Sequence, residues 1–305
     1  MGVILHREPK LENPVLIASW PGIANIGVAA VETLIQELRA EAFGEIEPWD
    51  FFYPSKIVVS HGELVDMEFP TSKFYFKKMS GNDLIFFLGE EQPNEGRMAY
   101  AQGTKALQLA NFVLDIAVKF GCQKVYTSGA AVSFIHHTMK PRVWATPNAE
   151  RLIREVGKYD NTVLMSDVQG RGGQGTISGL NGLLLGVARK RGLDAICLMG
   201  EIPMYLQGLA PIYPKASASV LEVLTSILGI TIKMDNIAEI AERGEREIER
   251  LYTRFPPEIR EHLDRLKDIF SEQPAQSGPI TEEDKRKILD DIDKFFETGH
   301  KEGQE

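Results

Sequence analysis

The chain has 305 residues, of which 43% are hydrophobic and 25% are charged, an ordinary composition for a globular protein with a sizeable core. Its net charge of −9, without a cluster of Lys and Arg, argues against nucleic acid and anionic membranes as principal partners. No apolar run approaches the ~20 residues of a membrane helix, and residues 1–10 lack a signal-peptide core, so we expect a cytoplasmic protein.

Strands and helices are predicted to alternate through most of residues 14–230. Three short apolar runs are typical of strands buried on both faces of a parallel sheet: 14–20, 83–89 and 124–128. Helices are predicted to follow the first run, to about residue 39, and the second run, over about 94–120.

Weaker strand signals lie between and after these runs. Four partly alternating segments predict an antiparallel extension of the sheet: 42–52, 56–60, 63–69 and 73–77. Residues 142–146 are predicted as an edge strand and 148–157 as a short helix. A Pro- and aromatic-bearing loop over 203–214 precedes a helix at 216–228, and we expect this loop to contact partners.

The stretch 162–200 reads as strand, Gly-rich turn, helix and strand. Its apolar runs, 162–166 and 195–199, are predicted as parallel strands joined by a helix over 176–192. A right-handed crossover places the Gly-rich turn at the carboxyl edge of the sheet, where a ligand would bind. The alternation as a whole predicts a three-layer α/β/α sandwich.

Composition changes near residue 235, and we divide the chain accordingly. The predicted units are a sandwich domain at 1–234, a C-terminal helical extension at 235–270, a linker at 271–280, and a terminal amphipathic helix with its tail at 281–305. The last helix opens with a capping-box pattern, Thr281 facing Asp284. Its apolar stripe predicts contact with a partner surface.

The first Gly-containing loop is interpreted as a structural turn that carries Pro21, Gly22, Asn25 and Gly27. Its glycines have phosphate-loop spacing, but Val and Ala occupy positions 28 and 29, where Lys and Ser or Thr should stand. Without those groups there is no charge for terminal phosphates and no magnesium ligand. We therefore interpret its glycines as serving a tight turn and close packing.

The second Gly-rich turn, 170–175, matches G-x-G-x-x-G after a strand and before a helix, as a dinucleotide site requires. Its ribose-binding acid would be Glu201, which lies late in the sequence. We favour close backbone packing for these glycines. Two interpretations stay open beside it: dinucleotide binding, and another anion at the helix N-terminus, with these candidate residues: Arg171, Gly172, Gly173 and Gly175.

Glu90, Asp167 and Glu201 each follow a predicted buried strand. If those strands are neighbours, the three carboxylates could act as acid and base or hold a metal in one crevice. Acids at such positions also cap helices and bind backbone N–H groups, which is the interpretation that we favour. His136 and His137 are adjacent and would point apart on a regular element, so we predict no metal site. Two cysteines alone cannot form a zinc site.

Three segments together resemble the proteasome assembly chaperone 2 family: 14–27 with the sequence PVLIASWPGIANIG, 141–148 with PRVWATPN, and 175–186 with GTISGLNGLLLG. The resemblance covers about residues 14–230. It implies a fold similar to purine nucleoside phosphorylases, self-association into rings or smaller homo-oligomers, and chaperone or scaffold activity without a cofactor. Family members can dock on proteasomes through a tail that ends hydrophobic-Tyr-any residue, whereas residues 301–305 read KEGQE.

The leading hypothesis is therefore a non-enzymatic, homo-oligomeric protein-binding or assembly-chaperone-like protein with partners that include proteasome-related subunits. The alternative is a nucleoside phosphorylase- or hydrolase-like enzyme that uses a crevice lined by Glu90, Asp167 and Glu201. A structure discriminates between them, because convergence of at least two of these acids in a deep pocket would favour the enzyme.

Overall fold

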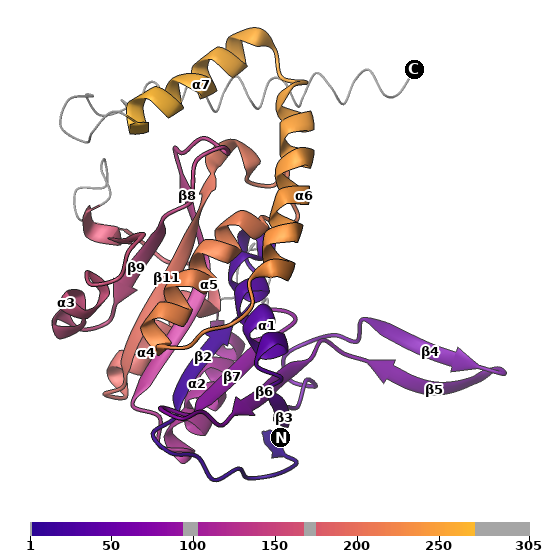
Figure 1. Cartoon of the computed structure of the whole chain (residues 1–305). Coiled ribbons are helices and arrows are strands. Elements are labelled where there is room, and N and C mark those ends of the chain that lie inside the picture. Colours follow the sequence, from indigo (N-terminus) through magenta and orange to yellow (C-terminus); the bar gives the residue numbers. More distant parts are fainter. Residues whose placement is uncertain (1, 94–102, 168–174, 272–305) are drawn as a thin grey trace.

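The computed structural model describes residues 2–93, 103–167 and 175–271, and within them a nine-stranded mixed sheet is flanked by helices (Figure 1). The sheet runs in the order β1 (Val3–Leu5), β3 (Glu41–Ile46), β6 (Ser72–Lys77), β7 (Leu84–Gly89), β2 (Val15–Ser19), β8 (Lys124–Ser133), β11 (Asp194–Pro203), β9 (Val143–Pro147) and β10 (Thr162–Leu164). The helices are α1 (Ile26–Glu37), α2 (Gly103–Lys119), α3 (Ile153–Val156), α4 (Gly179–Lys190), α5 (Pro214–Leu228), α6 (Asp235–Tyr252) and α7 (Pro257–Ser271).

The centre of the sheet is parallel. β2 pairs in parallel with β7 and β8, and β8 pairs in parallel with β11. All residues of β2 are buried, which explains why the apolar run predicted there shows no alternation. The predicted buried parallel strands at 14–20, 83–89, 124–128 and 195–199 are confirmed.

The prediction for residues 162–166, a buried strand parallel to 195–199, is wrong. β9 lies between β10 and β11, and it pairs in parallel with β10 but antiparallel with β11. The chain segments 162–164 and 194–203 therefore run in opposite directions and do not form the expected parallel crossover. β10 is the half-buried edge strand, and β9, predicted as the edge, is internal with Val143 and Ala145 fully buried.

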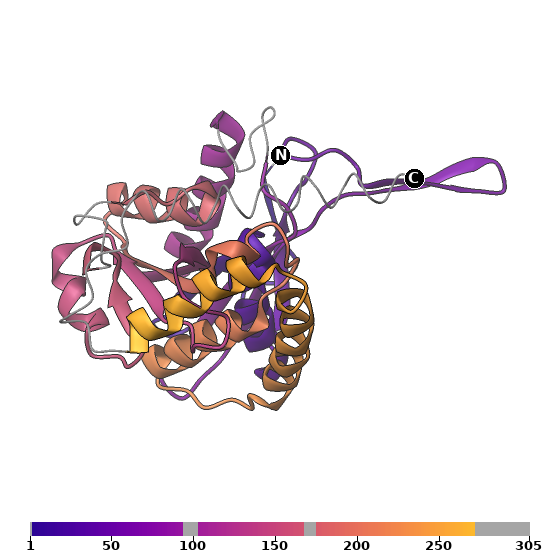
Figure 2. The same ribbon diagram turned by 90° about the horizontal axis from the view of Figure 1, so that it is seen from above.

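The antiparallel extension is confirmed only in part. β1, β3 and β6 continue the sheet beside β7 through antiparallel pairs. The two segments between β3 and β6 form instead a separate two-stranded ribbon, β4 (Lys56–Ser60) and β5 (Glu63–Glu68). Figures 1 and 2 show this ribbon projecting away from the body of the molecule.

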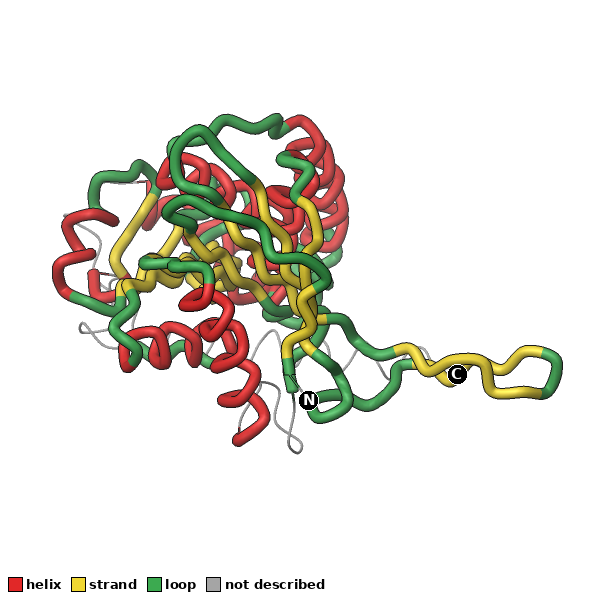
Figure 3. Tube along the Cα trace, turned by 90° about the horizontal axis from the view of Figure 1, so that it is seen from below, coloured by secondary structure: helices red, strands yellow, loops and turns green. Residues whose placement is uncertain are grey.

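Helices cover both faces of the sheet, and each face has its own hydrophobic core (Figure 3). Side chains alternate between the faces along β2, so that Leu16 and Ala18 pack with residues of α2 and α4, whereas Ile17 packs with residues of α1 and α5. The sheet and its two helical layers thus build a mixed α/β fold. The similarity to nucleoside phosphorylases stays a prediction.

The two charged amphipathic helices expected after residue 235 are present as α6 and α7. α6 packs against α5, and the core on that face includes Tyr252, Phe255, Ile259 and Leu263. No helix within the described part of the chain is long and apolar enough to cross a membrane. The predicted linker beyond Ser271 and the terminal helix at 281–305 lie outside the described residues, as does the start of the helix predicted at 94–120.

Candidate functional site

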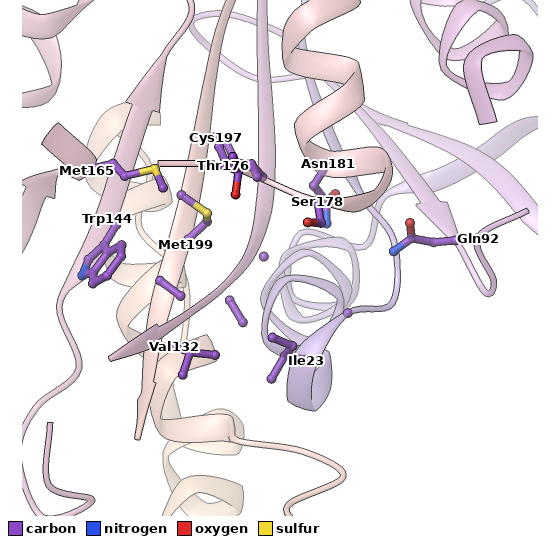
Figure 4. Close-up of a pocket in the computed structure, with 15 residues that line it drawn as sticks. Ile23, Gln92, Val132, Trp144, Met165, Thr176, Ser178, Asn181, Cys197 and Met199 are labelled. Carbon is purple, nitrogen blue, oxygen red and sulfur yellow. The ribbon is translucent and has the colours of Figure 1, made fainter. Parts of the chain in front are cut away.

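A cavity of about 300 Å³ lies at the carboxyl edge of the parallel strands. Figure 4 shows its walls, which come from the loops after β2 and β7, from β8, β9 and β11, and from the start of α4. Its position is a topological switch point, because the chain leaves β2 toward β7 on one side and leaves β8 toward β11 on the other. The lining residues are Gly22, Ile23, Gln92, Gly129, Ala130, Ala131, Val132, Trp144, Met165, Thr176, Ile177, Ser178, Asn181, Cys197 and Met199.

The loop after β2 enters the cavity and turns sharply into α1. Ala24 and Asn25 have left-handed backbone angles, with φ of 50° and 49°. A Cβ atom on Gly27 would overlap the carbonyl oxygen of Ser128 in β8, so only glycine allows this approach. Gly22 has open space around it and lines the cavity instead.

Gln92, which sequence reasoning missed, connects this loop to the start of α4. Its side-chain nitrogen donates to the carbonyl of Pro21, and its oxygen accepts from the amide N–H of Leu180 at 2.9 Å. An amide group that a helix N-terminus would offer to an anion is therefore already occupied. Gly179, at φ +77°, leaves room for this contact, since a Cβ there would lie 2.8 Å from the Gln92 oxygen.

Of the four anion-binding candidates, Arg171, Gly172 and Gly173 lie outside the described residues. Gly175 packs against Met165, whose side chain a Cβ at position 175 would overlap. This contact is with a side chain, and close backbone packing by the glycines of the turn stays a prediction. Anion binding by the turn stays a prediction.

Asn181, also missed, is the buried polar side chain of the cavity. It lies in the first turn of α4 and is 7% exposed, and its Oδ1 atom has no hydrogen-bond partner among the described residues. Its Nδ2 atom lies 3.6 Å from where a Cβ on Gly129 would stand. The only sequence signal for it was an amide among the apolar residues that begin the helix.

The remaining walls are uncharged and mostly apolar. Trp144, Met165 and Met199 lie across the cavity from Asn181 (Figure 4), and no charged side chain of the described residues lines it. Burial raises the pKa of the Cys197 thiol to about 11, although a hydrogen bond with Thr127 lowers it in part. The thiol therefore stays protonated at neutral pH and is a poor nucleophile.

Glu201 is completely buried in β11 and serves as an acceptor for five hydrogen bonds. Arg142 donates from its backbone N–H at 2.9 Å and from its guanidinium at 2.8 and 3.2 Å. Trp144 donates from its indole N–H at 2.7 Å, and Ser133 from its hydroxyl at 3.1 Å. The carboxylate thereby fixes β9 and the end of β8 against β11.

The other two acids do not join Glu201. Glu90 is exposed and exchanges two hydrogen bonds with the backbone of Thr71, at 2.8 and 2.9 Å. Asp167 is exposed and accepts from Ser166 at 3.0 Å. β2 and β8 separate the strand of Glu90 from that of Glu201, and none of the three residues lines the cavity. The structure thus does not assemble the carboxylate-lined crevice on which the enzymatic alternative depends.

His136 and His137 lie side by side, with ring centroids 4.1 Å apart, because they sit in a loop and not on a regular element. The expectation that they point apart applied to a regular helix or strand, and this loop does not meet that condition. His137 contacts the Tyr205 hydroxyl at 2.8 Å and Glu249 of α6 at 3.0 Å. This cluster ties the loop after β8 to α6. Within the described residues no three His, Cys, Asp or Glu side chains are placed to hold a metal ion.

A group of exposed apolar side chains lies on the ribbon formed by β4 and β5. Val59 is paired with Leu64, and Ile57 with Met67, because a register shift follows Val58. These four side chains share one face of the ribbon. Ile57, Val59 and Leu64 are 62 to 63% exposed. We call this set, residues Ile57, Val59, Leu64 and Met67, the hairpin face.

The aromatic loop at 203–214, by contrast, is mostly part of the core. Met204, Tyr205, Leu206 and Tyr213 are buried, and only Ile212 is a large exposed apolar residue there. Partner contact by this loop stays a prediction, and Ile212 is the large apolar residue that it exposes. Sequence reasoning located the apolar residues of both segments but could not decide which segment projects.

A nine-stranded mixed sheet flanked by helices, with a projecting two-stranded ribbon, makes this a mixed α/β protein. The PAC2 family model matches residues 16–252, which is most of the chain, and the chain belongs to that family. It is 30% identical over 290 residues to the uncharacterized protein MJ1210 of Methanocaldococcus jannaschii, covering 93% of this chain and 97% of the relative. The resemblance inferred from the sequence is confirmed.

Solved structures of other proteins share this fold. The chain is similar to PbaB of Pyrococcus furiosus, an archaeal proteasome activator, with a TM-score of 0.67 and 27% identity over 82% of this chain and 97% of that one. A Mycobacterium tuberculosis proteasome-assembly chaperone homologue has a TM-score of 0.63 at 18% identity, covering 79% of this chain and 97% of that one. At that identity the likeness concerns the fold alone.

Proposed function

We propose that the protein is a homo-oligomeric, assembly-chaperone-like factor that binds proteasome-related subunits through the hairpin face. Membership of the PAC2 family and the similarity to a proteasome activator support the choice of partner. The structure's own contribution is the ribbon, and the exposure of the hairpin face is the observation that carries the proposal.

Such a ribbon is stabilised when another surface buries its apolar face. A two-stranded hairpin is at best marginally stable in water, and β4 and β5 pair only with each other in the described sheets. Burial of an apolar face lowers the free energy of the system by about 25 cal/mol per Å² of apolar surface removed from water. Contact with a partner's apolar surface provides that burial, and projection from the body makes the face accessible.

The mechanism follows from this geometry. The hairpin face would cover apolar surface on a subunit until the subunit's own neighbour replaces it. Self-association would present several ribbons at once, which raises the avidity for a partner of repeated subunits. No cofactor is needed for this exchange of apolar contacts.

The test compares the full chain with a Val59→Lys/Leu64→Lys variant by size exclusion with light scattering, alone and mixed with an archaeal proteasome core particle. We expect the wild-type chain to exceed the mass of one protomer and to co-migrate with the core particle. The variant should lose co-migration and keep its thermal midpoint, because exposed positions contribute little to stability.

A matched control is Ser60→Lys/Glu63→Lys, which changes exposed polar residues of the same ribbon and should bind as the wild type does. A wild-type chain that is monomeric at micromolar concentration contradicts the self-association. Undiminished co-migration of the Val59→Lys/Leu64→Lys variant contradicts the role of the hairpin face.

A further inference from the structure

We propose that the cavity at the carboxyl edge of the sheet binds an uncharged, planar heteroaromatic compound with a hydrogen-bond donor and acceptor side by side, as in adenine. This small-molecule site is separate from the hairpin face and does not depend on the proposed protein-binding function. Four features of the cavity carry it: its open floor, the unpartnered Oδ1 atom of Asn181, the lack of charge among the described lining residues, and its volume.

The floor of the cavity is built from backbone and small side chains. The ladder between β2 and β8 ends at the pair Ser19 and Ser128, whereas β8 continues to Ser133 beside β11. The residues just past that point, Gly129, Ala130 and Ala131, line the cavity and leave its space unfilled. A ligand can therefore lie flat against this part of β8.

Asn181 supplies the recognition group. A buried oxygen without a hydrogen-bond partner is rare in folded proteins and costs free energy, so its presence calls for an explanation. A carboxamide presents a donor and an acceptor together, and it pairs in a bidentate way with the N6 and N7 edge of adenine. The Asn181 side chain points into the cavity (Figure 4), and its Oδ1 atom has no hydrogen-bond partner among the described residues, so a ligand with a matching edge would supply one.

The other walls select against charge and in favour of a ring. A charged ligand would lose its hydration without meeting a counter-charge from the described lining residues. One N–H group of the α4 N-terminus, that of Leu180, already donates to Gln92 and is not offered to an anion. Met165 and Met199 present thioethers, which make favourable contacts with aromatic rings.

The volume limits the size of the ligand. At about 300 Å³ the cavity lies at the lower end of the range for small-molecule sites. It suits a free base or a nucleoside better than a dinucleotide. A hydrogen-bond donor and acceptor lie side by side in free bases, in nucleosides and in nicotinamide, and the test separates these ligands.

The experiment is isothermal titration calorimetry of the full chain with adenine, adenosine, nicotinamide and AMP at millimolar concentration. We expect at least one of the three uncharged probes to bind, and AMP to bind no more tightly than adenosine. Asn181→Leu, which keeps the branched shape of the side chain and removes the amide, should weaken binding about ten- to one-hundred-fold. Its thermal midpoint without ligand should be equal or higher, because an unpartnered buried amide is removed.

Gly129→Ala is a second variant that does not depend on the amide. Its methyl group would lie 3.6 Å from Asn181 Nδ2 and 4.0 Å from Met199 Cγ, which fits without strain but reduces the cavity. It should also weaken binding. Gly186→Ala, in the same helix as Asn181 with open space around it, is the control and should leave binding unchanged.

Three results would overturn the proposal. The first is no heat of binding from any uncharged probe. The second is binding that neither Asn181→Leu nor Gly129→Ala weakens, which would place the ligand elsewhere. The third is tighter binding of AMP than of adenosine, which would make the site one for anions.

Discussion

Glu201 is fully buried, and neighbouring groups donate hydrogen bonds to both oxygens of its carboxylate. Its carboxylate bridges three elements through Arg142 of the loop before β9, Trp144 of β9 and Ser133 of β8. The Arg142 side chain is 39% exposed, so water screens the ion pair in part. The hydrogen bonds, and not the ion pair alone, therefore dominate the stabilisation by this residue.

Glu201→Gln removes the charge and replaces one acceptor atom with a donor. The indole N–H of Trp144 or a donor of Arg142 then loses its acceptor inside the protein. We expect the free energy of unfolding to fall by about 2 kcal/mol or more, measured by urea denaturation. Glu90→Gln is the control, because that side chain is exposed and its amide oxygen can still accept from Thr71. A change below about 0.5 kcal/mol at Glu201 would contradict this account, since that is the range of surface substitutions.

At the scale of elements, the packing of α1 on β8 depends on one glycine. The Cβ of any other residue at position 27 would overlap the backbone carbonyl of Ser128, and backbone moves less easily than a side chain. Gly27→Ala should therefore displace the start of α1 and lower the free energy of unfolding by about 3 kcal/mol.

Gly186→Ala serves as the comparison in thermal or urea unfolding. That position has no atom within 4 Å of the added Cβ, so the change should stabilise α4 by about 0.5 to 1 kcal/mol. Equal effects at the two positions would show that Gly27 has no special packing role.

Sequence patterns reveal elements more reliably than they reveal neighbours. The buried runs at 14–20 and 83–89 identified central strands because they are apolar on both faces. The same reasoning misplaced 162–166, since an apolar run does not record which strand lies beside it. β9 enters between β10 and β11 through pairing that no local pattern encodes.

The functional surface shows the same limit. Alternation and a His-Gly turn predict a hairpin at 56–68 whether it joins the sheet or projects from it. Only the observed order of strands shows that β4 and β5 lie outside the nine-stranded sheet. Likewise, Glu90, Asp167 and Glu201 each follow a predicted strand, but the intervening strands keep them apart. Asn181 became recognisable only once its burial and missing partner were known.

At the scale of the molecule, two surfaces are available for two kinds of ligand. The ribbon extends from one end of the sheet, beside β3 and β6 (Figure 1), whereas the cavity lies at the carboxyl edge and is lined by residues of β8 and β11. No residue of the ribbon lines the cavity. The fold separates the proposed protein contact from the proposed small-molecule site.

Amide hydrogen exchange of residues 56–68 tests the role of the hairpin face most directly. An isolated two-stranded ribbon opens easily, so its amides should exchange fast in the protein alone. With a saturating archaeal proteasome core particle, we predict slowed exchange in this segment, while exchange around the cavity stays unchanged. A bound complex in which residues 56–68 exchange as fast as in the free chain would contradict the account.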